Sequence, residues 1–549
     1  MATVIHPSPP DHLTTPATAS VATPGDAESR DPATGELLRR YPAATREQVF
    51  AAAAAARAAQ GEWAAQPLAI RVRMLRRFHE TLYDRRREIA GALTRENGKP
   101  AAEALASEVA TVLDFARYYA EQAPGFLRAP WAGAWSLGMK RKRVRVVREP
   151  FGVIGVISPW NYPFMLSAAI ALPALVTGNA VLLKPSELTP TSGALLGELL
   201  LEAGLPRDLF AVLQGSGATG GALCDAPVDK IFFTGSVATG RKVAVACATR
   251  LIPCALELGG SDAAIVLADA DLSHAASGIA WGRFSNAGQT CVAPKRVYVE
   301  AAVYDEFIGA LGRVVRALRV GPGASVDTDV GPLIRPEAAD RLRAQRDEAV
   351  GRGATAVASS LPEATTPRAD GAPETRSGFF APTVLLNVPA DARVLHEETF
   401  GPLLPVVKVS DADEAVALAN ASEFGLAASI WSRDTQRAAA LASRIDAGCV
   451  LVNDAIVAAG MPDVPHGGVK QSGIGRTHGI AGLEECVRTK ATVTERFPGL
   501  PQPWWFGYGR EHLAALEAFV ELAHAANGFA RLRAIPRLVR MLMAARRPR

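Results

Sequence analysis

The stretch FGVIGVISPWNYPFMLSAAIALPALVTGNAVLL, residues 151–183, runs for 33 residues without a charged side chain. A run of that length is long enough to suggest a membrane span. Pro159, Pro163 and Pro173 interrupt it, however, and both of its ends continue into strand-like sequence. We interpret it as a buried strand–helix–strand unit, because parallel strands that are covered on both faces are continuously apolar.

Strand and helix patterns continue to alternate beyond this unit. FAVLQG, KIFFTG and CALELGG have the apolar composition of strands, and LLGELLLEAG and VATGRKVAVACAT have the pattern of helices. This alternation predicts a doubly wound parallel sheet, which binds ligands at the carboxyl ends of its strands. A second α/β stretch runs from about residue 261 to 470, with strands at RVYVE and GCVLVND, and residues 353–378 within it are expected to form a surface loop.

The segments around these two stretches have other patterns. Apolar residues recur every three or four positions over residues 46–123, which predicts helices. KRKRVRVVREP alternates charged and apolar residues as an exposed strand would, and CVRTKATVTERF could pair with it or with another subunit. Residues 1–30 are rich in Pro, Thr and Ala, and we expect a disordered leader there and not a targeting segment.

Charge and cysteine content exclude some classes of function. The whole chain carries +4, and residues 531–549 contain seven arginines and no acid, so the remainder sums to −3. A near-neutral body gives no support for nucleic-acid binding. The six cysteines have no CxxC spacing and no zinc-type pattern with histidine, so we expect no metal site. Sparse unpaired cysteines indicate a reducing compartment, and we expect a cytoplasmic protein.

The last 52 residues, 498–549, form a helical basic extension in this interpretation. PWWFGYG clusters Trp504, Trp505, Phe506 and Tyr508, and EHLAALEAFVELAHAANG has an amphipathic pattern. The final segment could place apolar side chains on one face and arginines on another: Leu538, Val539, Leu542 and Met543 against Arg537, Arg540 and Arg547. Such a segment can lie on an anionic membrane surface; the alternative, which we favour, is a tail that packs on its own or a neighbouring subunit.

Two glycine-rich turns follow predicted strands. GSGATG (215–220) matches GxGxxG, but the next strand ends in Thr234-Gly235 and not in the acid that a dinucleotide fingerprint requires. A simple strand-to-helix turn is the favoured alternative. FTGSVATG (233–240) places Gly235 and Ser236 at a helix N-terminus, where free N–H groups suit a pyrophosphate.

Two strand ends carry charged residues. In LKPSE, Lys184 and Glu187 could hold the hydroxyls of a ribose or simply be a solvated strand end. In LELGG, Glu257 ends an apolar strand, where a carboxylate is either paired structurally or desolvated and raised in pKa toward the role of a general base.

The turn NAGQTCVAPKR, residues 286–296, holds Cys291 among small polar residues. A free thiol has a pKa of about 8.5 and is only a few per cent ionised at neutral pH, so a nucleophilic cysteine needs activation. No base lies beside Cys291 in sequence, but the fold could bring Glu257 and Asn161 to it.

Seven motifs together resemble one family. PWNYP, KPSE, FTGSVATG, LELGG, GQTC, EETFGP and PHGGVKQSGIGR occur in the order and approximate spacing of the NAD(P)-dependent aldehyde dehydrogenase superfamily, over about residues 31–497. The resemblance implies a Rossmann-type dinucleotide domain (31–132 and 153–256), an α/β catalytic domain (257–479) and a β-ribbon (133–152 and 480–497) that joins subunits into a homodimer or homotetramer.

The resemblance also implies a role for each motif residue. Cys291 would attack the aldehyde carbon to give a thiohemiacetal, with the Asn161 amide and the Cys291 N–H as the oxyanion hole. Loss of hydride to the cofactor would leave a thioester, which water activated by Glu257 would hydrolyse.

For the cofactor, the resemblance places Trp160 and Lys184 on the adenosine side and Glu187 at the adenine ribose. The turn with Gly235, Ser236 and Gly240 would lie at the pyrophosphate. Glu398 would hold the nicotinamide ribose, and Phe400 would pack near the ring. A carboxylate at Glu187 would repel a 2′-phosphate, so we expect NAD in preference to NADP.

Four positions depart from the family pattern. Ile170 and Thr477 stand where many members carry a lysine and a glutamate proposed to relay protons. Ala169 and Ser285 stand where the succinate-semialdehyde branch carries arginines, which favours an apolar aliphatic or aromatic aldehyde. The alternatives are a catalytically silent member that serves as a structural or binding protein, a succinate-semialdehyde-type substrate, a CoA-acylating enzyme and a Cys/His hydrolase.

Overall fold

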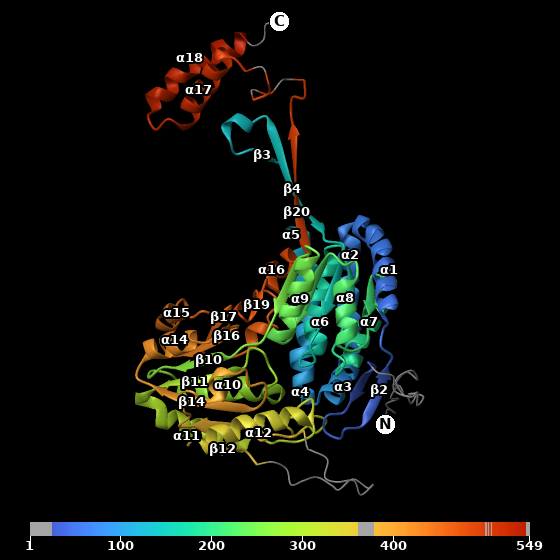
Figure 1. The fold of residues 1–549 in the computed structure, drawn as a ribbon, viewed down its shortest axis with the longest axis vertical. Helices are drawn as coiled ribbons and strands as arrows, with labels where there is room; N and C mark the ends of the chain where they lie inside the picture. Colours follow the sequence, from blue (N-terminus) through green and yellow to red (C-terminus); the bar gives the residue numbers. More distant parts are fainter. Residues whose placement is uncertain (1–24, 361–377, 500–501, 503, 507, 545–549) are drawn as a thin grey trace, which may run out of the picture. The chain divides into compact units, whose positions relative to one another are not determined.

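The computed structural model describes residues 25–360, 378–499, 502, 504–506 and 508–544 (Figure 1). The chain divides into two units, one formed by Met1–Phe126 with Pro150–Arg488 and the other by Leu127–Glu149 with Thr489–Arg549. We call them the main unit and the arm. Among the described residues, no helix is both long and apolar enough to cross a membrane.

The uncharged run of residues 151–183 forms a strand, a helix and a strand, as predicted. They are β5 (Val153–Ile157), α6 (Pro163–Val176) and β6 (Ala180–Lys184), and all three are almost wholly buried. The sheet to which they belong has the order β19-β9-β8-β5-β6-β7. Its other strands are β7 (Phe210–Val212), β8 (Lys230–Thr234), β9 (Cys254–Glu257) and β19 (Gly473–Ile474). Only β19 is antiparallel to its neighbour.

The strand order reverses at β5, which lies between β8 and β6. In a doubly wound sheet the crevice at such a reversal, outside the carboxyl ends of the strands, is where ligands bind. The connecting helices are α7 (Pro190–Glu202), α8 (Gly217–Asp225) and α9 (Val237–Thr249).

The predicted N-terminal helices are present. They are α1 (Arg46–Ala65), α2 (Leu68–Asp84), α3 (Arg86–Asn97), α4 (Ala101–Glu103), the π-helical turn η2 (Ala104–Ala110) and α5 (Thr111–Phe126). Gly98 ends α3 at φ 87°, and a Cβ there would lie 2.9 Å from the ring of Pro332. Glycine is therefore required at this stop.

The prediction of a disordered leader over residues 1–30 is wrong at the C-terminal end of that segment. Ala27–Arg30 form β1, which pairs antiparallel with β2 (Leu37–Tyr41). Ala27 is fully buried, and Glu28 forms ion pairs with Arg30 and Arg40, so both packing and charge hold the strand. The rest of the leader, residues 1–24, lies outside the described residues.

The second α/β stretch forms a sheet of order β12-β13-β14-β11-β10-β16-β17. Its strands are β10 (Asp262–Val266), β11 (Pro294–Glu300), β12 (Thr355–Ala358), β13 (Thr383–Leu386), β14 (Leu403–Val409), β16 (Ala427–Trp431) and β17 (Cys449–Val452). All pairs except β12–β13 are parallel. A two-stranded sheet of β15 (Phe424–Gly425) and β18 (Val469–Lys470) lies apart from it.

Helices cover both faces of this sheet, and each face has its own apolar core. One core receives α10 (Leu272–Phe284), α11 (Tyr304–Ala317) and α12 (Pro336–Gly351), and the other α14 (Ala412–Asn420) and α15 (Thr435–Ala442) (Figure 1). The short helices are η4 (Ser285–Gly288), η5 (Ala301–Val303), α13 (Arg393–His396), η6 (Val457–Gly460) and α16 (Gly479–Glu484).

The insertion predicted as a surface loop begins with a strand. Residues 355–358 form β12, because a full backbone pairing with the edge strand β13 is available to them. The remaining insertion residues, 361–377, lie outside the described ones.

The arm contains the two charged ribbons side by side in one sheet of order β20-β4-β3. Its strands are β3 (Ala132–Gly133), β4 (Lys142–Pro150) and β20 (Val487–Glu495). The connection between β3 and β4 contains the short helix η3 (Leu137–Met139). Ion pairs cross the ribbon from Lys142 to Glu495 at 2.9 Å and from Lys490 to Glu149 at 2.8 Å. Of the two pairings left open by the sequence, the structure shows the one within the chain. Two helices complete the arm, α17 (Arg510–His524) and α18 (Gly528–Ala544).

Candidate active site

The cysteine turn has a strained backbone. After α10, Asn286, Ala287 and Gly288 all have positive φ, at 52°, 54° and 72°. A non-glycine residue in this region costs of the order of 1–3 kcal/mol, so contacts elsewhere must hold the turn. A Cβ on Gly288 would collide with the backbone of Gly401, so the glycine lets the cysteine turn lie directly against the EETFGP loop.

Cys291 follows this turn and is partly buried. Its side chain packs against a small apolar cluster centred on Val292, Leu426 and Ala427. Burial raises the pKa of the Cys291 thiol to about 12; the Lys295 ammonium lowers it, and the carboxylates of Asp262 and Glu257 raise it further. The thiol is therefore protonated at rest, and a nucleophilic role for Cys291 would require the removal of that proton.

Asn161 lies beside the turn, immediately before α6. Its Nδ2 donates to the backbone oxygen of Gln289 at 3.1 Å, and the side chain is buried. A carboxamide NH₂ has two hydrogens, so one remains for a substrate oxygen. Tyr162 ties the same two segments together, because its hydroxyl lies 2.9 Å from the Thr290 hydroxyl.

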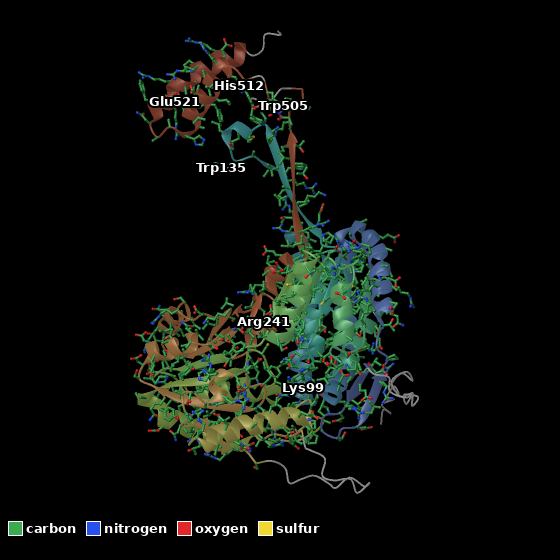
Figure 2. All side chains as sticks on the ribbon, in the orientation of Figure 1. Lys99, Trp135, Arg241, Trp505, His512 and Glu521 are labelled. Atoms are coloured by element: carbon green, nitrogen blue, oxygen red, sulfur yellow. The ribbon has the colours of Figure 1, made fainter. Side chains whose placement is uncertain are left out.

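A group of charged and polar side chains lies behind Asn161 and the cysteine turn. We call Lys99, Glu103, Glu108 and Asn286 the support cluster. Lys99 Nζ donates to Glu108 Oε1 at 2.5 Å and to the backbone oxygen of Asn161 at 2.9 Å (Lys99 is labelled in Figure 2). Asn286 Nδ2 donates to the same Asn161 oxygen at 2.9 Å.

Glutamates of the support cluster hold both segments by their backbone amides. Glu108 Oε2 accepts from the N–H groups of Phe164 and Met165, at 3.2 and 2.8 Å, in the first turn of α6. Glu103 Oε2 accepts from the Asn286 N–H at 2.8 Å, within the strained turn. Burial raises the pKa of Glu103 to about 7. The nucleophile turn and the predicted oxyanion donor are thus fixed by one network.

Glu257 ends β9 and lies in a second buried group, the base pocket, which we define as Glu257, His466, Arg476 and His478. Neither carboxylate oxygen of Glu257 meets a donor at full hydrogen-bond geometry among the described residues. Burial raises the pKa of Glu257 well above its usual value, and Arg476 offsets this only in part. A desolvated carboxyl of this kind is poised for proton transfer.

One histidine faces this carboxyl, and a second stacks on the first. His466 Nε2 lies 3.9 Å from Glu257 Oε2, and the His466 and His478 rings stack with centroids 5.1 Å apart. Neither ring nitrogen of His478 has a partner among the described residues. Burial lowers the pKa of His466 to about 4 and that of His478 well below its usual value, so both rings are neutral.

The predicted cofactor residues lie at the reversal point of the first sheet. Lys184 ends β6, and its Nζ is 3.1 Å from Glu187 Oε2. Burial alone would raise the pKa of Glu187, but the charge and hydrogen bond of Lys184, a backbone hydrogen bond and the charge of Arg335 together outweigh it, so the pKa is lowered and the carboxylate stays ionised.

The FTGSVATG turn joins β8 to α9 as predicted. Ser236 is the N-cap of α9 and accepts from the Thr239 N–H at 3.3 Å, and the Gly235 N–H donates to the Glu257 carbonyl at 3.0 Å. A Cβ on Gly235 would lie 2.7 Å from the Phe233 ring, and one on Gly240 would collide with Leu258. The helix N-terminus with a glycine approach fits a dinucleotide pyrophosphate, and Gly240 serves helix–strand packing.

The EETFGP loop carries the other predicted contacts. Glu398 Oε1 accepts from the Gly260 N–H at 3.1 Å, which places it against the LELGG turn. The Phe400 and Trp160 rings meet edge to face, with centroids 5.4 Å apart. The structure therefore brings Trp160 to Phe400, whereas the family resemblance placed Trp160 on the adenosine side of the cofactor and Phe400 near the nicotinamide ring.

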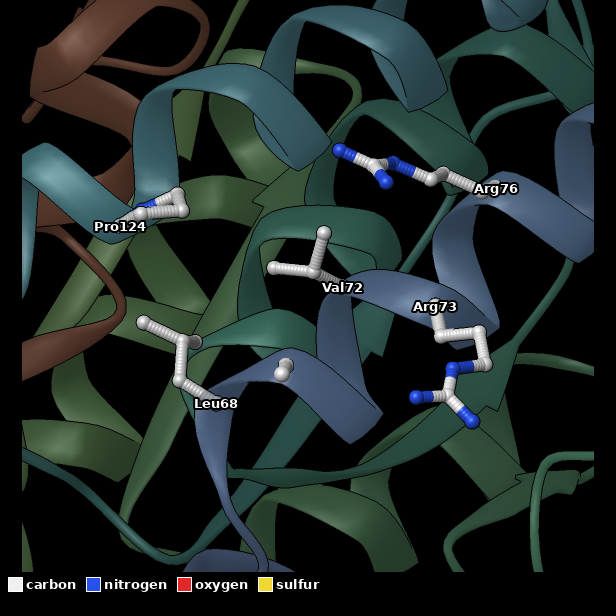
Figure 3. Close-up of a pocket in the computed structure, with 6 residues that line it drawn as sticks. Leu68, Val72, Arg73, Arg76 and Pro124 are labelled. Carbon is white, nitrogen blue, oxygen red and sulfur yellow. The ribbon is translucent and has the colours of Figure 1, made fainter.

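GSGATG behaves as the simple turn that the sequence favoured. Ser216 caps α8 through the Ala218 N–H, and Thr219 Oγ1 donates to the carbonyl of Ala44, ahead of α1. These polar groups are used within the fold. A surface pocket between α2 and α5 also lies outside the site: Figure 3 shows it lined by Leu68, Val72, Arg73, Arg76 and Pro124, with no predicted site residue among them.

Several functional neighbours escaped the sequence reasoning. No motif of the sequence pointed to Lys99, although Lys99 is the central cation of the support cluster. Arg283 was missed as well; it is fully buried and donates to the carbonyls of Leu403 and Thr399, which holds the EETFGP loop. The PHGG motif contained His466, but nothing in sequence pointed to its stacking on His478.

Comparison with known proteins identifies relatives along nearly the whole chain. Residues 20–492 match the profile of the aldehyde dehydrogenase family. The chain is 38% identical over 493 residues to the 4,4'-diapolycopene aldehyde oxidase of a Methylomonas species, which covers 90% of each chain. It is 39% identical over 471 residues to a putative succinate-semialdehyde dehydrogenase [NADP(+)] of Mycolicibacterium smegmatis, covering 86% of this chain and 89% of the relative.

A solved structure agrees with the fold. The NAD-dependent aldehyde dehydrogenase from Sinorhizobium meliloti superimposes with a TM-score of 0.80 at 36% identity, covering 88% of this chain and 93% of the other.

Proposed function

The chain belongs to the aldehyde dehydrogenase family as an NAD(P)-dependent enzyme, and we propose that it oxidises an apolar aliphatic or aromatic aldehyde to the carboxylic acid through Cys291 and Glu257. The observation that supports this assignment best is that Asn161 Nδ2 donates to the backbone oxygen of Gln289 at 3.1 Å, which brings this amide beside the turn that carries the Cys291 thiol. The predicted fold class, a Rossmann-type domain with an α/β catalytic domain, is confirmed by the structural match.

In the proposed mechanism, the Cys291 thiol gives its proton to solvent water, its sulfur attacks the aldehyde carbon, and the carbonyl oxygen becomes an oxyanion. The free Asn161 amide hydrogen and the Cys291 N–H donate to that oxyanion. A nicotinamide cofactor, which Glu398 and Phe400 would hold, would supply the hydride acceptor, and loss of hydride from the thiohemiacetal would leave a thioester on Cys291. Glu257 then takes a proton from water, the hydroxide adds to the thioester carbon, and the acid leaves as the sulfur is released.

For the cofactor we propose NAD in preference to NADP. Glu187 is ionised and half-exposed, where it suits a ribose diol and repels a 2′-phosphate. Lys184 beside it could offset that repulsion, and one relative carries NADP(+) in its name. We assign Trp160 to the same end of the cofactor as Phe400, because the two rings touch.

For the substrate, the apolar cluster beside Cys291 supports an apolar aldehyde. Ala169 is buried, and the Ser285 hydroxyl donates to the Trp281 carbonyl at 2.6 Å, so neither offers a cation to a substrate carboxylate. Lys295 is occupied with backbone carbonyls. The name of the Methylomonas relative supports a long apolar aldehyde, and that of the Mycolicibacterium relative favours succinate semialdehyde as the second candidate.

For the assembly we propose a homodimer or homotetramer joined through the ribbon of β4 and β20. The outer strand β20 is exposed along most of its length, which leaves its edge free to pair.

The testing experiment follows NADH or NADPH formation with octanal, benzaldehyde and succinate semialdehyde, for the native chain and Cys291→Ser. We expect turnover of the two apolar aldehydes that disappears in the variant. Preference for succinate semialdehyde would overturn the substrate proposal. Absence of turnover by a folded protein that binds NAD would favour a catalytically silent member of the family. A requirement for CoA would indicate that CoA, and not water, accepts the acyl group.

A further inference from the structure

The net positive charge of the molecule lies in the arm. Its 84 residues, 127–149 and 489–549, contain 17 lysines and arginines against five glutamates, a net charge of +12. Since the whole chain carries +4, the remaining 465 residues sum to −8. Such a segregation of charge indicates an anionic partner for the arm.

Helix α18 has one face against α17 and another that no described residue of the arm covers. Ala534 is buried and Leu538 is half-buried, so this side of α18 meets α17. Phe529, Leu532, Ile535 and Val539 are all exposed; Leu532, for example, keeps 65% of its surface. Their spacing of three, three and four residues places them along one stripe of the helix.

Arginines line both edges of this apolar stripe. At about 100° per residue, Arg531 falls on one edge, and Arg533 and Arg540 fall on the other. All three are exposed. The Arg533 guanidinium also lies 4.5 Å from the centre of the Phe529 ring. An apolar stripe between cationic edges matches a lipid surface, where the apolar side chains enter the interface and the arginines reach the phosphates.

Aromatic residues of the kind found at membrane interfaces gather in the same unit. Four of the eight tryptophans of the chain are in the arm: Trp131, Trp135, Trp504 and Trp505. Trp135 and Phe506 are exposed over 93% and 94% of their surfaces. Figure 2 shows Trp135 and Trp505 in the arm with His512 and Glu521 of α17.

Contacts within the arm connect this aromatic group to the helices. Tyr508 meets the His512 ring of α17 with centroids 5.4 Å apart. A Cβ on Gly138 would lie 2.9 Å from the Phe519 ring, so the loop that carries Trp135 lies against α17 as well. Tryptophan and tyrosine are enriched where apolar and wet environments meet.

We propose that α18 and the aromatic segment of the arm form a docking surface for an anionic phospholipid membrane, which would present the enzyme to aldehydes dissolved in the bilayer. The presentation of the enzyme to such aldehydes rests on the proposed function, whereas binding of the arm to a membrane does not. A second copy of α18 is a poor occupant because it would set its own arginine edges against those of the stripe, and a nucleic acid would leave the apolar stripe uncovered.

The test uses vesicle flotation of the full-length protein with phosphatidylcholine alone and with added phosphatidylglycerol. We expect the protein to float only with the anionic vesicles, and less in high salt. The double variant Phe529→Asp and Leu532→Asp should lose about tenfold or more of its vesicle partitioning, because two apolar side chains leave the interface. Arg533→Glu with Arg540→Glu should lose about as much, since each basic residue near an anionic surface contributes roughly fivefold or more.

Leu251→Asp is the matched control, because Leu251 is an apolar side chain of the main unit that is exposed over 93% of its surface. It should float like the native protein. Failure of the native protein to float with anionic vesicles overturns the proposal, as does equal flotation of native and stripe variants. A stripe variant that instead changes the molar mass in light scattering would show that a second copy covers the stripe. Turnover of octanal without vesicles, measured on the same samples, reports on the proposed function independently.

Discussion

The support cluster and the base pocket are two buried polar groups in one unit, and they differ in how completely their atoms are paired. In the support cluster, both Glu108 oxygens accept hydrogen bonds, and Lys99 donates to two acceptors. In the base pocket, Glu257 and His478 have no hydrogen-bond partner at full geometry among the described residues.

This difference distinguishes the residues that hold the candidate site in place from the residue proposed to transfer a proton. A well-paired network makes a structure rigid, and this one, which leaves the Asn286 Oδ1 atom unpaired among the described residues, fixes Asn161 and the strained cysteine turn. An unsatisfied buried carboxyl costs stability, but it leaves the oxygens of Glu257 free for water and raises its pKa toward proton transfer. The following predictions test that division.

The largest effect is expected for Glu257→Gln. If Glu257 is the base for thioester hydrolysis, turnover should fall by about 10²–10⁴-fold. The first turnover should survive as a burst of NADH, because acylation of Cys291 precedes the step that is lost. The melting temperature, measured by thermal unfolding, should be unchanged or higher, since the substitution removes an uncompensated acid. A large drop in melting temperature would place Glu257 with the support residues.

Glu108→Ala should mainly affect stability. Removing one partner of a buried ion pair leaves Lys99 uncompensated, which costs about 3–5 kcal/mol of unfolding free energy. Denaturant unfolding measures this loss. Glu108→Gln is the milder control, because its amide oxygen can still accept from the first turn of α6. Equal stability of the native and alanine forms would contradict the support role.

Asn161 connects the support cluster to the proposed reaction, because its backbone carbonyl accepts from Lys99 and Asn286 and its side-chain amide is the proposed oxyanion donor. Asn161→Ala retains the carbonyl and removes one oxyanion donor, so kcat should fall by an amount that corresponds to about 2.7–4 kcal/mol of barrier. Circular dichroism on heating should show little change. A loss confined to KM would argue against an oxyanion role.

The base pocket should make the protein sensitive to acid. The folded pKa of His466 is lowered from 6.5 to about 4, so its contribution is complete above pH 6.5 and is lost as the pH falls through about 4. The loss amounts to about 3 kcal/mol at most, at 1.36 kcal/mol per pKa unit. Unfolding free energy against pH should therefore be flatter in His466→Phe, with exposed His396→Phe as the control. Identical slopes in all three proteins would refute the prediction.

The smallest effect is expected at the solvent-exposed edge of the crevice. Glu187→Gln removes the charge that opposes a 2′-phosphate, so the ratio of kcat/KM for NAD to that for NADP should fall about tenfold, or about 1.4 kcal/mol. Initial rates with both cofactors measure this ratio. An unchanged ratio would leave the selectivity to other residues.

Local pattern was sufficient for much of the architecture. The uncharged run predicted β5, α6 and β6, and the alternation that follows predicted the parallel sheet, because burial on both faces requires apolar strands. Pattern failed at β1 and β12, each of four residues, because such short edge strands depend on the partner with which they pair.

The sequence by itself determined which groups are present: the thiol of Cys291, the amide of Asn161, the carboxyl of Glu257 and the motifs that place them in a family. Tertiary structure alone decided their surroundings. Lys99 meets the Asn161 carbonyl across 62 positions of sequence, and His466 stacks on His478 because an antiparallel bridge pairs His466 with Thr477. Burial and hydrogen bonding set the pKa values and the rigidity of the site, and both depend on neighbours that are distant in the chain.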